Sequence, residues 1–149
     1  MPKITANKKV LFDYQVIEKL EAGIVLTGAE VKAIKGGFIN LKGSYVTIRG
    51  NELWLINCHI SPYKMASSQG KYDPSHDRKL LLNKKEIASL IGTLKAQGLT
   101  VMPISVYTKG SLIKIEIGIC RGRKKQDKRE LIKRRESDRR IRRLLRNKT

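Results

Sequence analysis

Several segments of the chain alternate between apolar and polar residues, the pattern of a β-strand with one buried face. In the clearest segment, the isoleucines at alternate positions of 113–119 face one way, while Lys114 and Glu116 face the other way. A run rich in β-branched residues over 99–107 precedes this segment, and residues 108–111 supply a turn. The two segments therefore predict a pair of neighbouring antiparallel strands.

The first half of the chain carries shorter segments of the same kind. Residues 45–49 and 52–56 flank Gly50-Asn51, which is a two-residue hairpin signal. An earlier strand is predicted over 14–17 and again over 24–27.

A helical pattern follows Asn83. The Asn83 side chain can accept a hydrogen bond from the free backbone amide of the third helical residue. The Glu86 side chain can reach back to the backbone amide of Asn83, and together the two bonds form a capping box. Apolar residues then recur at helical spacing over 87–94, and Gly98 is the expected left-handed cap. A shorter helix is predicted over 29–35, closed by Gly36-Gly37.

Together these elements predict a mainly β fold with inserted helices. Five or six short antiparallel strands and a late helix favour a small closed barrel of the oligonucleotide-binding type. An open α+β sheet is the alternative architecture. The expected domain covers residues 1–120, a length that suits a single core.

Charge separates a tail from this domain. Residues 121–149 contain fifteen Lys or Arg, four Asp or Glu, no aromatic residue and only five aliphatic ones, for a net charge of +11 out of +19. Such a segment buries too little apolar surface to offset the entropy of ordering, so we expect it to be disordered in isolation. Nucleic acid is the leading partner, because neutralising phosphates releases counterions. A tail that only aids solubility is the alternative.

The remaining composition offers little chemistry. Cys58 and Cys120 have no metal-ligand spacing and are expected to be buried, reduced thiols, while His59 and His76 lack partners for a zinc site. No catalytic motif, signal peptide or membrane span is visible, so we expect a soluble, cytoplasmic protein without enzymatic activity, metal or cofactor. Exposed aromatic residues are few, which favours structured RNA over single strands as the partner.

The order of several short motifs resembles that of the SsrA-binding protein (small protein B) family over nearly the whole chain. Each motif is short, but seven of them occur in the family's order and spacing. The matching pieces are Asn7-Lys8-Lys9, Glu21-Ala22-Gly23-Ile24, Gly28-Ala29-Glu30-Val31-Lys32, Asn40-Leu41 with Ser44-Tyr45-Val46, His59-Ile60-Ser61-Pro62-Tyr63, Arg78-Lys79-Leu80-Leu81-Leu82 and Asp127-Lys128-Arg129-Glu130.

The resemblance implies an oligonucleotide-binding barrel that grips the tRNA-like domain of transfer-messenger RNA, the RNA of bacterial trans-translation. Asn7, Glu21 and Leu81 match family positions of that face or its support. Glu21 would accept a hydrogen bond from a base amino group or a 2′-hydroxyl. Its alternative role is a structural hydrogen bond at a strand bulge beside Gly23. For Leu81, the alternative is a position in the hydrophobic core. Phosphate contacts are expected from the neighbouring cations, namely Lys8, Lys9, Lys32, Arg78 and Lys79.

For the tail, the resemblance implies folding into a helix in the empty mRNA channel near the decoding centre of a stalled ribosome. Asp127 to Glu130 form a second capping pattern, and Leu144 and Leu145 lie on the helix's apolar side. The tail residues expected to act there are Gly122, Arg123, Lys124, Asp127, Lys128, Arg129, Leu144 and Leu145.

The implied partners are transfer-messenger RNA and the ribosome, with elongation factor Tu and alanyl-tRNA synthetase acting indirectly on a monomeric protein. The chain departs from the family pattern at Arg123, where Lys is common, at Gln126, where His is frequent, and at His76, where Arg is frequent. A structural ribosomal protein or assembly factor is the alternative function, and an RNA-modifying enzyme is a third.

Overall fold

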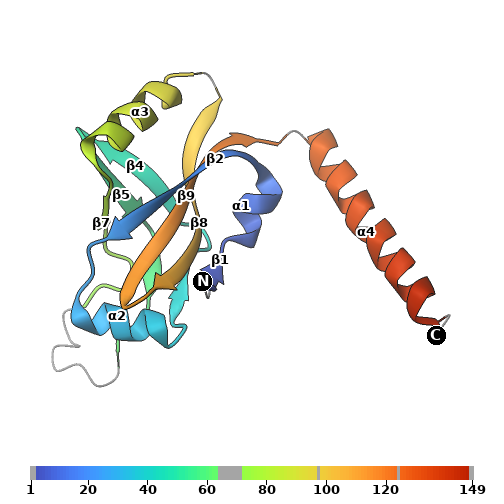
Figure 1. Ribbon diagram of the computed structural model, residues 1–149, viewed down its shortest axis with the longest axis horizontal. Helices are drawn as coiled ribbons and strands as arrows, with labels where there is room; N and C mark the ends of the chain where they lie inside the picture. The colour runs from blue at the N-terminus through green and yellow to red at the C-terminus, as the bar shows by residue number, and fades with distance from the viewer. Residues whose placement is uncertain (1–2, 64–71, 97, 124, 148–149) are drawn as a thin grey trace.

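The computed structural model describes residues 3–63, 72–96, 98–123 and 125–147, and it omits the side chains of 125–127 and 146–147. Most of the described strands form one antiparallel sheet in the order β1-β8-β9-β2-β7-β5-β4 (Figure 1). These seven strands are β1 (Lys3–Ala6), β2 (Tyr14–Ile24), β4 (Tyr45–Arg49), β5 (Glu52–Ile56), β7 (Arg78–Leu81), β8 (Leu99–Lys109) and β9 (Leu112–Gly122). A separate two-stranded ladder joins β3 (Ile39–Asn40) and β6 (His59–Ile60).

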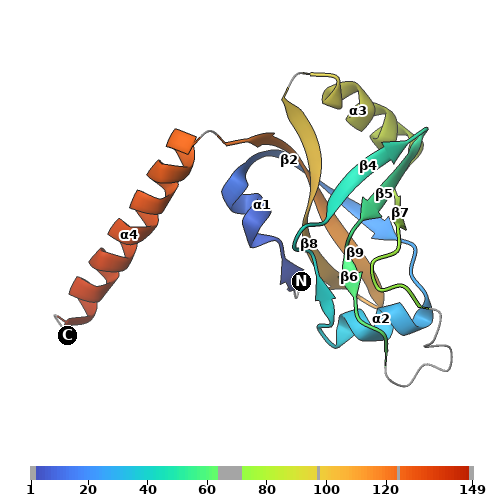
Figure 2. The ribbon, with the colours of Figure 1, turned by 180° about the vertical axis from the view of Figure 1, so that it is seen from behind.

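Four helices accompany the strands in the described part of the chain. Helix α1 (Lys8–Asp13) packs on β2 and β8, while α2 (Gly28–Lys35) and α3 (Lys84–Leu94) lie at opposite ends of the sheet (Figures 1 and 2). Helix α4 (Lys125–Asn147) projects away from the sheet and contacts it through α1. The body and the basic tail are thus distinct in space.

The sheet is curved but not hydrogen-bonded into a ring. Strand β4 comes close to β8, yet β1 and β4 remain the edge strands of the ladder in the described chain. The mainly β class with inserted helices is confirmed, whereas closure of the barrel is not.

The core lies on the concave side of this sheet. The isoleucines predicted to face inward, at alternate positions of 113–119, are all at most 8% exposed. Helix α2 contributes Ile34 and α3 contributes Leu90, both essentially fully buried. Cys58 and Cys120 are free and buried, and burial raises the pKa of each thiol to about 11.

Some of the local features predicted from the sequence are present in the structure, and others are not. The hairpin at Gly50-Asn51 and the capping box of Asn83 and Glu86 are confirmed. Gly98 does adopt a positive φ of 82°, but α3 ends earlier, at Leu94, so Gly98 is not its cap. The two strands predicted over 14–17 and 24–27 are one strand that ends at Ile24.

Helix α4 begins two residues before Asp127, so Asp127 is not its cap and the second capping prediction is wrong. Residues 125–147 are helical in the structure, while disorder of the tail in isolation and its folding on the ribosome stay predictions. Strand β9 runs to Gly122, two residues past the expected end of the domain. None of the described helices is both long enough and apolar enough to cross a membrane.

Candidate nucleic-acid interface

The convex face of β8, β9, β2 and β7 brings several predicted site residues together. Glu21 pairs with Glu116, Gly23 with Leu81, and Tyr107 with Lys114. Because paired residues and alternate residues of a strand share a face, these side chains form one surface, which we call the outer face. Its four lysines and two glutamates give it a positive charge. The outer face consists of Lys19, Glu21, Lys79, Leu81, Tyr107, Lys109, Lys114 and Glu116.

Leu81 provides an apolar element on the outer face. Its side chain is 50% exposed, whereas Leu80, the preceding residue of β7, is 1% exposed. The alternative that Leu81 is a core residue is therefore wrong. A groove of about 560 Å³ between β7 and α3 is lined by Leu81 together with Lys79 and Lys84. The neighbouring Gly23 lets β2 approach closely, since a Cβ there would lie 3.3 Å from that of Leu81.

Glu21 is held by two donors from β8. The Tyr107 hydroxyl donates to Oε2, and Lys109 Nζ lies 3.2 Å from Oε1. The Tyr107 hydroxyl, followed by Lys109, holds the pKa of Glu21 below its ordinary value, so the carboxylate is ionised at neutral pH. Burial and the Glu21 carboxylate raise the pKa of Tyr107. The two bonds to Glu21 are structural hydrogen bonds, as its alternative role expected, but they do not lie at a bulge, because the bulge in β2 is between Val16 and Glu18.

Asn7 supports the fold from within. It is 4% exposed and caps α1 by accepting from the Val10 amide at 3.3 Å. Its amide nitrogen donates to the carbonyl oxygens of Leu41 and Pro103, each at 3.3 Å. These bonds place Asn7 in the expected support of the interface, and its side chain is not available for RNA.

The cations near the motifs separate into exposed and buried groups. Lys8 and Lys9 are exposed on α1, and Lys32 is exposed on α2, where its Nζ lies 5.6 Å from the Tyr63 ring centroid. Lys79 is 40% exposed and lies 3.3 Å from Glu52. These four lysines remain available to phosphates.

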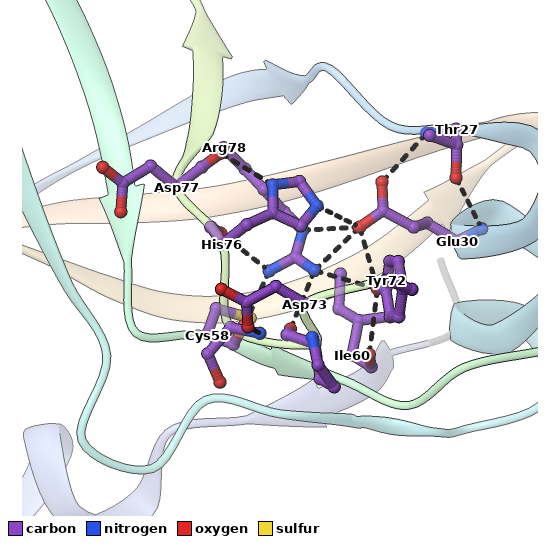
Figure 3. A network of polar contacts seen from close by, with 11 residues as sticks. Thr27, Glu30, Cys58, Ile60, Tyr72, Asp73, His76, Asp77 and Arg78 are labelled. Carbon is purple, nitrogen blue, oxygen red and sulfur yellow. Dashed lines mark hydrogen bonds and ion pairs between the residues drawn. The ribbon is translucent and has the colours of Figure 1, made fainter. Parts of the chain in front are cut away.

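Arg78 differs because it is 1% exposed and belongs to a buried polar network (Figure 3). Its Nε lies 2.7 Å from Glu30 Oε2, and Nη1 donates to the Cys58 carbonyl at 2.6 Å. Nη2 donates to the Tyr72 hydroxyl at 3.0 Å and to the Pro74 carbonyl at 2.9 Å. Each guanidinium nitrogen is therefore occupied, so the phosphate contact expected for Arg78 is not compatible with this fold.

Glu30 is the centre of that network. It is 2% exposed and also accepts from Tyr72 at 3.1 Å, while His76 Nε2 lies 3.0 Å away (Figure 3). Burial would raise the pKa of Glu30, but hydrogen bonds from the Thr27 amide and Arg78 outweigh burial and lower it. The network therefore joins α2 to residues 72–78 and fixes the start of β7, which carries Lys79 and Leu81 to the outer face.

The start of the tail is attached to α1. The Arg123 amide donates to the Asp13 carbonyl at 2.8 Å, and Lys128 Nζ lies 3.1 Å from Asp13 Oδ1. Further along α4, the Arg135 guanidinium lies 5.7 Å from the Phe12 ring centroid. We call Phe12 and Asp13, with these contacts, the α1 anchor.

The other predicted tail residues lie outside the anchor. Gly122 ends β9 and Arg129 is exposed, while Leu144 and Leu145 are 59% and 62% exposed. Lys124 and the side chain of Asp127 lie outside the described part of the structure. An exposed leucine pair at the far end of a basic helix is suited to contact a partner.

The structure thus unites Glu21, Lys79 and Leu81 on one face and leaves Lys8, Lys9 and Lys32 on separate helices. Sequence reasoning missed Tyr107 and Lys109, because their link to Glu21 spans strand β9 and depends on register. It also missed Glu30, although the Thr27 to Glu30 spacing is a capping box that could have been read.

Known proteins match this architecture and sequence. The family model described as SmpB protein matches residues 4–147. The chain belongs to the SmpB family. It is 49% identical over 142 residues to the SsrA-binding protein of Gloeothece citriformis, covering 95% of this chain and 92% of that protein. It is 47% identical over 144 residues to that of Coxiella burnetii, covering 97% and 91%.

A solved structure shares the fold as well. It is described as "tmRNA-SmpB: a journey to the center of the bacterial ribosome" and matches with a TM-score of 0.66 and 35% identity. The match covers 86% of this chain and 93% of that one. The curved sheet and the helices of this chain are thus similar to those of a solved structure described as SmpB.

Proposed function

We propose that this protein is an RNA-binding adaptor of bacterial trans-translation in the cytoplasm. The sheet domain, residues 1–120, binds the tRNA-like domain of transfer-messenger RNA, and the protein delivers that RNA to stalled ribosomes. The tail, residues 121–149, reads the empty mRNA channel at the decoding centre, so that incomplete proteins are tagged for degradation. The proposal assigns no bond-making step to the protein.

The observation that carries this proposal is the separation of two basic surfaces. The outer face joins lysines to an ionised carboxylate and an exposed leucine, which together suit a folded RNA with both phosphates and unpaired groups. Helix α4 stands away from that face (Figure 2), and it forms most of the tail 121–149, which carries +11 of the net charge of +19. Membership of the SmpB family supports RNA and the ribosome as the two partners.

Each tail residue takes a role from this arrangement. Arg123, Lys124, Lys128 and Arg129 neutralise ribosomal RNA phosphates beside the body. Gly122 is the last residue of β9 before the tail, and Asp127 lies in the first turn of α4, where the helix dipole favours a negative charge. Leu144 and Leu145 supply the apolar contact at the far end. We further propose that the protein acts as a monomer, with elongation factor Tu and alanyl-tRNA synthetase acting on the RNA.

The first test separates the two surfaces. A chain that ends at residue 122 is titrated against the tRNA-like domain, with bulk tRNA as the competitor and across a salt series. We expect selective binding that survives near physiological salt, together with complete loss of tagging in a reconstituted stalled translation system. Equal and steeply salt-dependent binding to both RNAs would indicate charge neutralisation alone and would contradict the proposal.

A second test addresses the ribosomal alternative. A structural ribosomal protein co-purifies with essentially every ribosome, whereas an adaptor is substoichiometric and enriched on stalled ribosomes. Quantitative mass spectrometry of ribosomes, with and without mRNA lacking a stop codon, measures this ratio. A constant ratio of one protein per ribosome would favour the structural role.

A further inference from the structure

Glu21 is an unusual group to find in the middle of a basic RNA-facing surface. Four of the charged residues on the outer face are lysines, and phosphate oxygens are repelled by a carboxylate. Yet Glu21 is 35% exposed at its side chain, and both of its oxygens are engaged by neighbouring side chains. The arrangement fixes where this acceptor points.

The two donors are not required to hold the strands together. Tyr107 and Lys109 come from β8, and β9 lies between β8 and β2. Continuous antiparallel ladders already join β8 to β9 and β9 to β2 along most of their length. The bonds from β8 therefore cross over β9 to a single side chain, and their main effect is on the orientation and charge of Glu21.

Tyr107 is suited to this task because it is itself immobilised. Tyr107 is only 8% exposed, so its ring has little freedom to move and its hydroxyl has a fixed position. A tyrosine hydroxyl carries one proton, and here it is donated to Oε2 of Glu21. Lys109 is more exposed, at 53%, and approaches the other oxygen.

An ionised carboxylate has about four acceptor positions, of which Tyr107 and Lys109 occupy two. The remaining positions can accept a hydrogen bond only from an N–H or O–H group. Phosphate oxygens carry no such hydrogen and are therefore excluded as partners. In RNA such donors are base-edge amino and imino groups, of which guanine has two side by side, and ribose 2′-hydroxyls. Unpaired nucleotides present these groups most openly.

We propose that Tyr107 and Lys109 are positioning residues that hold Glu21 as the specificity-determining acceptor for a hydrogen-bond donor of an unpaired nucleotide. The inference rests on the proposed function and deepens it. Affinity then comes from the other lysines of the outer face, while discrimination between RNAs comes from the oriented carboxylate.

The test compares Tyr107→Phe and Lys109→Gln in the full-length protein with Tyr45→Phe, a control at an exposed tyrosine of β4. Thermal unfolding by circular dichroism first establishes that each variant is folded. The ratio of Kd values for bulk tRNA and the tRNA-like domain is then measured across a salt series. We expect each of the two positioning variants to lose about threefold to tenfold in this ratio, the range expected for one lost hydrogen bond, and Tyr45→Phe to lose nothing.

The salt series distinguishes positioning from phosphate contact. If Lys109 neutralised a phosphate, Lys109→Gln would lower the slope of log K against log salt by about 0.7 to 0.9. A positioning role leaves that slope unchanged, and Lys109→Arg restores the selectivity. In a Glu21→Gln background, Tyr107→Phe should have no further effect, because residues that act through one group are not additive. A lowered slope or additive losses would overturn the proposal.

Substituted RNAs identify the donor. Inosine in place of unpaired guanines removes the N2 amino group, and analogues without the exocyclic amino group replace unpaired adenines and cytosines. Methylation of the ring nitrogen removes the imino N–H of unpaired guanines and uridines, and 2′-deoxy substitution removes the hydroxyl. We expect one of these changes to weaken binding to the wild-type protein and to leave binding to Glu21→Gln unchanged. If none of the changes has an effect on the wild-type protein, the proposal fails. Absence of selectivity in the wild-type protein itself would instead contradict the proposed function.

Discussion

The buried pair of Arg78 and Glu30 is the strongest constraint that single residues place on this fold. The desolvation of both charges is offset only while every polar atom keeps its partner, and here the partners extend to Tyr72, His76 and the Cys58 carbonyl. Removing one member leaves the other charge buried and uncompensated. The pair therefore controls both stability and the placement of β7.

A first prediction concerns stability. Glu30→Gln should lower the free energy of unfolding by about 3 to 5 kcal/mol, the cost of leaving a buried partner unpaired. Urea denaturation followed by circular dichroism measures it. The control is Asp77→Asn, which breaks the exposed 2.8 Å ion pair with Arg49 and should cost less than about 1 kcal/mol. Equal costs for the two variants would contradict the central role of Glu30.

A second prediction concerns pH. Folding lowers the pKa of Glu30 below its ordinary value of 4.5, so its stabilising contribution is complete above that pH and is lost as the pH falls through the lowered pKa. The difference in unfolding free energy between the wild-type protein and Glu30→Gln should therefore be constant near neutrality and shrink below about pH 4.5. Denaturation curves between pH 3 and 7 test this, and a difference that grows on acidification would refute it.

Polar residues were the hardest ones to place from the sequence. Arg78 and Asn7 belong to motifs rich in cations and amides, and such residues are mostly exposed. Their burial depends on partners 48 and 34 residues away in the chain, Glu30 and the Leu41 carbonyl. Nothing in the local pattern reveals those partners, whereas the exposure of Leu81 next to a buried Leu80 follows directly from strand alternation.

At the scale of elements, local signals were informative where local energetics decide the structure. The 45–49 and 52–56 hairpin and the capping box at Asn83 depend on neighbours in the chain, and both were predicted correctly. Strands β3 and β6 are two residues each and exist only because they pair with one another. Helix α1 was missed because its six residues are too few to show an apolar repeat at helical spacing, although Asn7 caps it through a local bond from the Val10 amide.

Helix α4 has many like charges on its surface, which sets up a third prediction. Cations repeat at i, i+4, as in Arg135 with Arg139 and Arg139 with Arg143, and such pairs oppose a free helix. A peptide of residues 122–149 should therefore show little helix in water and become helical on adding ribosomal RNA fragments. Far-ultraviolet circular dichroism measures the change. High helicity in low-salt buffer without RNA would refute the expected disorder in isolation.

A fourth prediction, also on α4, concerns its leucine pair. Replacing Leu144 and Leu145 with Gln removes exposed apolar surface without changing the charge. Tagging of proteins from stalled ribosomes should fall, while affinity for the tRNA-like domain stays the same. The matched control replaces Ile132, which is 44% exposed nearer the body, with Gln. Unchanged tagging in the leucine variant would show that this end of the helix makes no essential contact.

At the scale of the whole molecule, the α1 anchor is the described link that gives the tail a direction. The Asp13 carboxylate pairs with Lys128, and its carbonyl accepts from the Arg123 amide, so one residue holds both sides of the junction. Phe12 adds a cation–π contact with Arg135, which lies seven residues beyond Lys128 in α4. Since α1 itself packs on β2 and β8, the anchor connects α4 to the sheet.

A fifth prediction tests this connection. In the complex with ribosomes, Asp13→Asn combined with Phe12→Ala should broaden the distance distribution between spin labels placed at Lys42 and Lys133, as measured by electron–electron double resonance. Binding of the tRNA-like domain should be unchanged, because neither residue lies on the outer face. The control is Asp73→Asn, an exposed carboxylate remote from α4. An unchanged distribution would mean that the ribosome alone orients the tail.

Because the anchor acts near the base of α4, that helix behaves as a lever. Its 23 residues extend for about 34 Å at 1.5 Å per residue, so a tilt of roughly 10° at Asp13 displaces the far end by about 6 Å. That is about the pitch of one helical turn. The few contacts between the six-residue helix α1 and the base of α4 therefore limit how far Leu144 and Leu145 can move relative to the body.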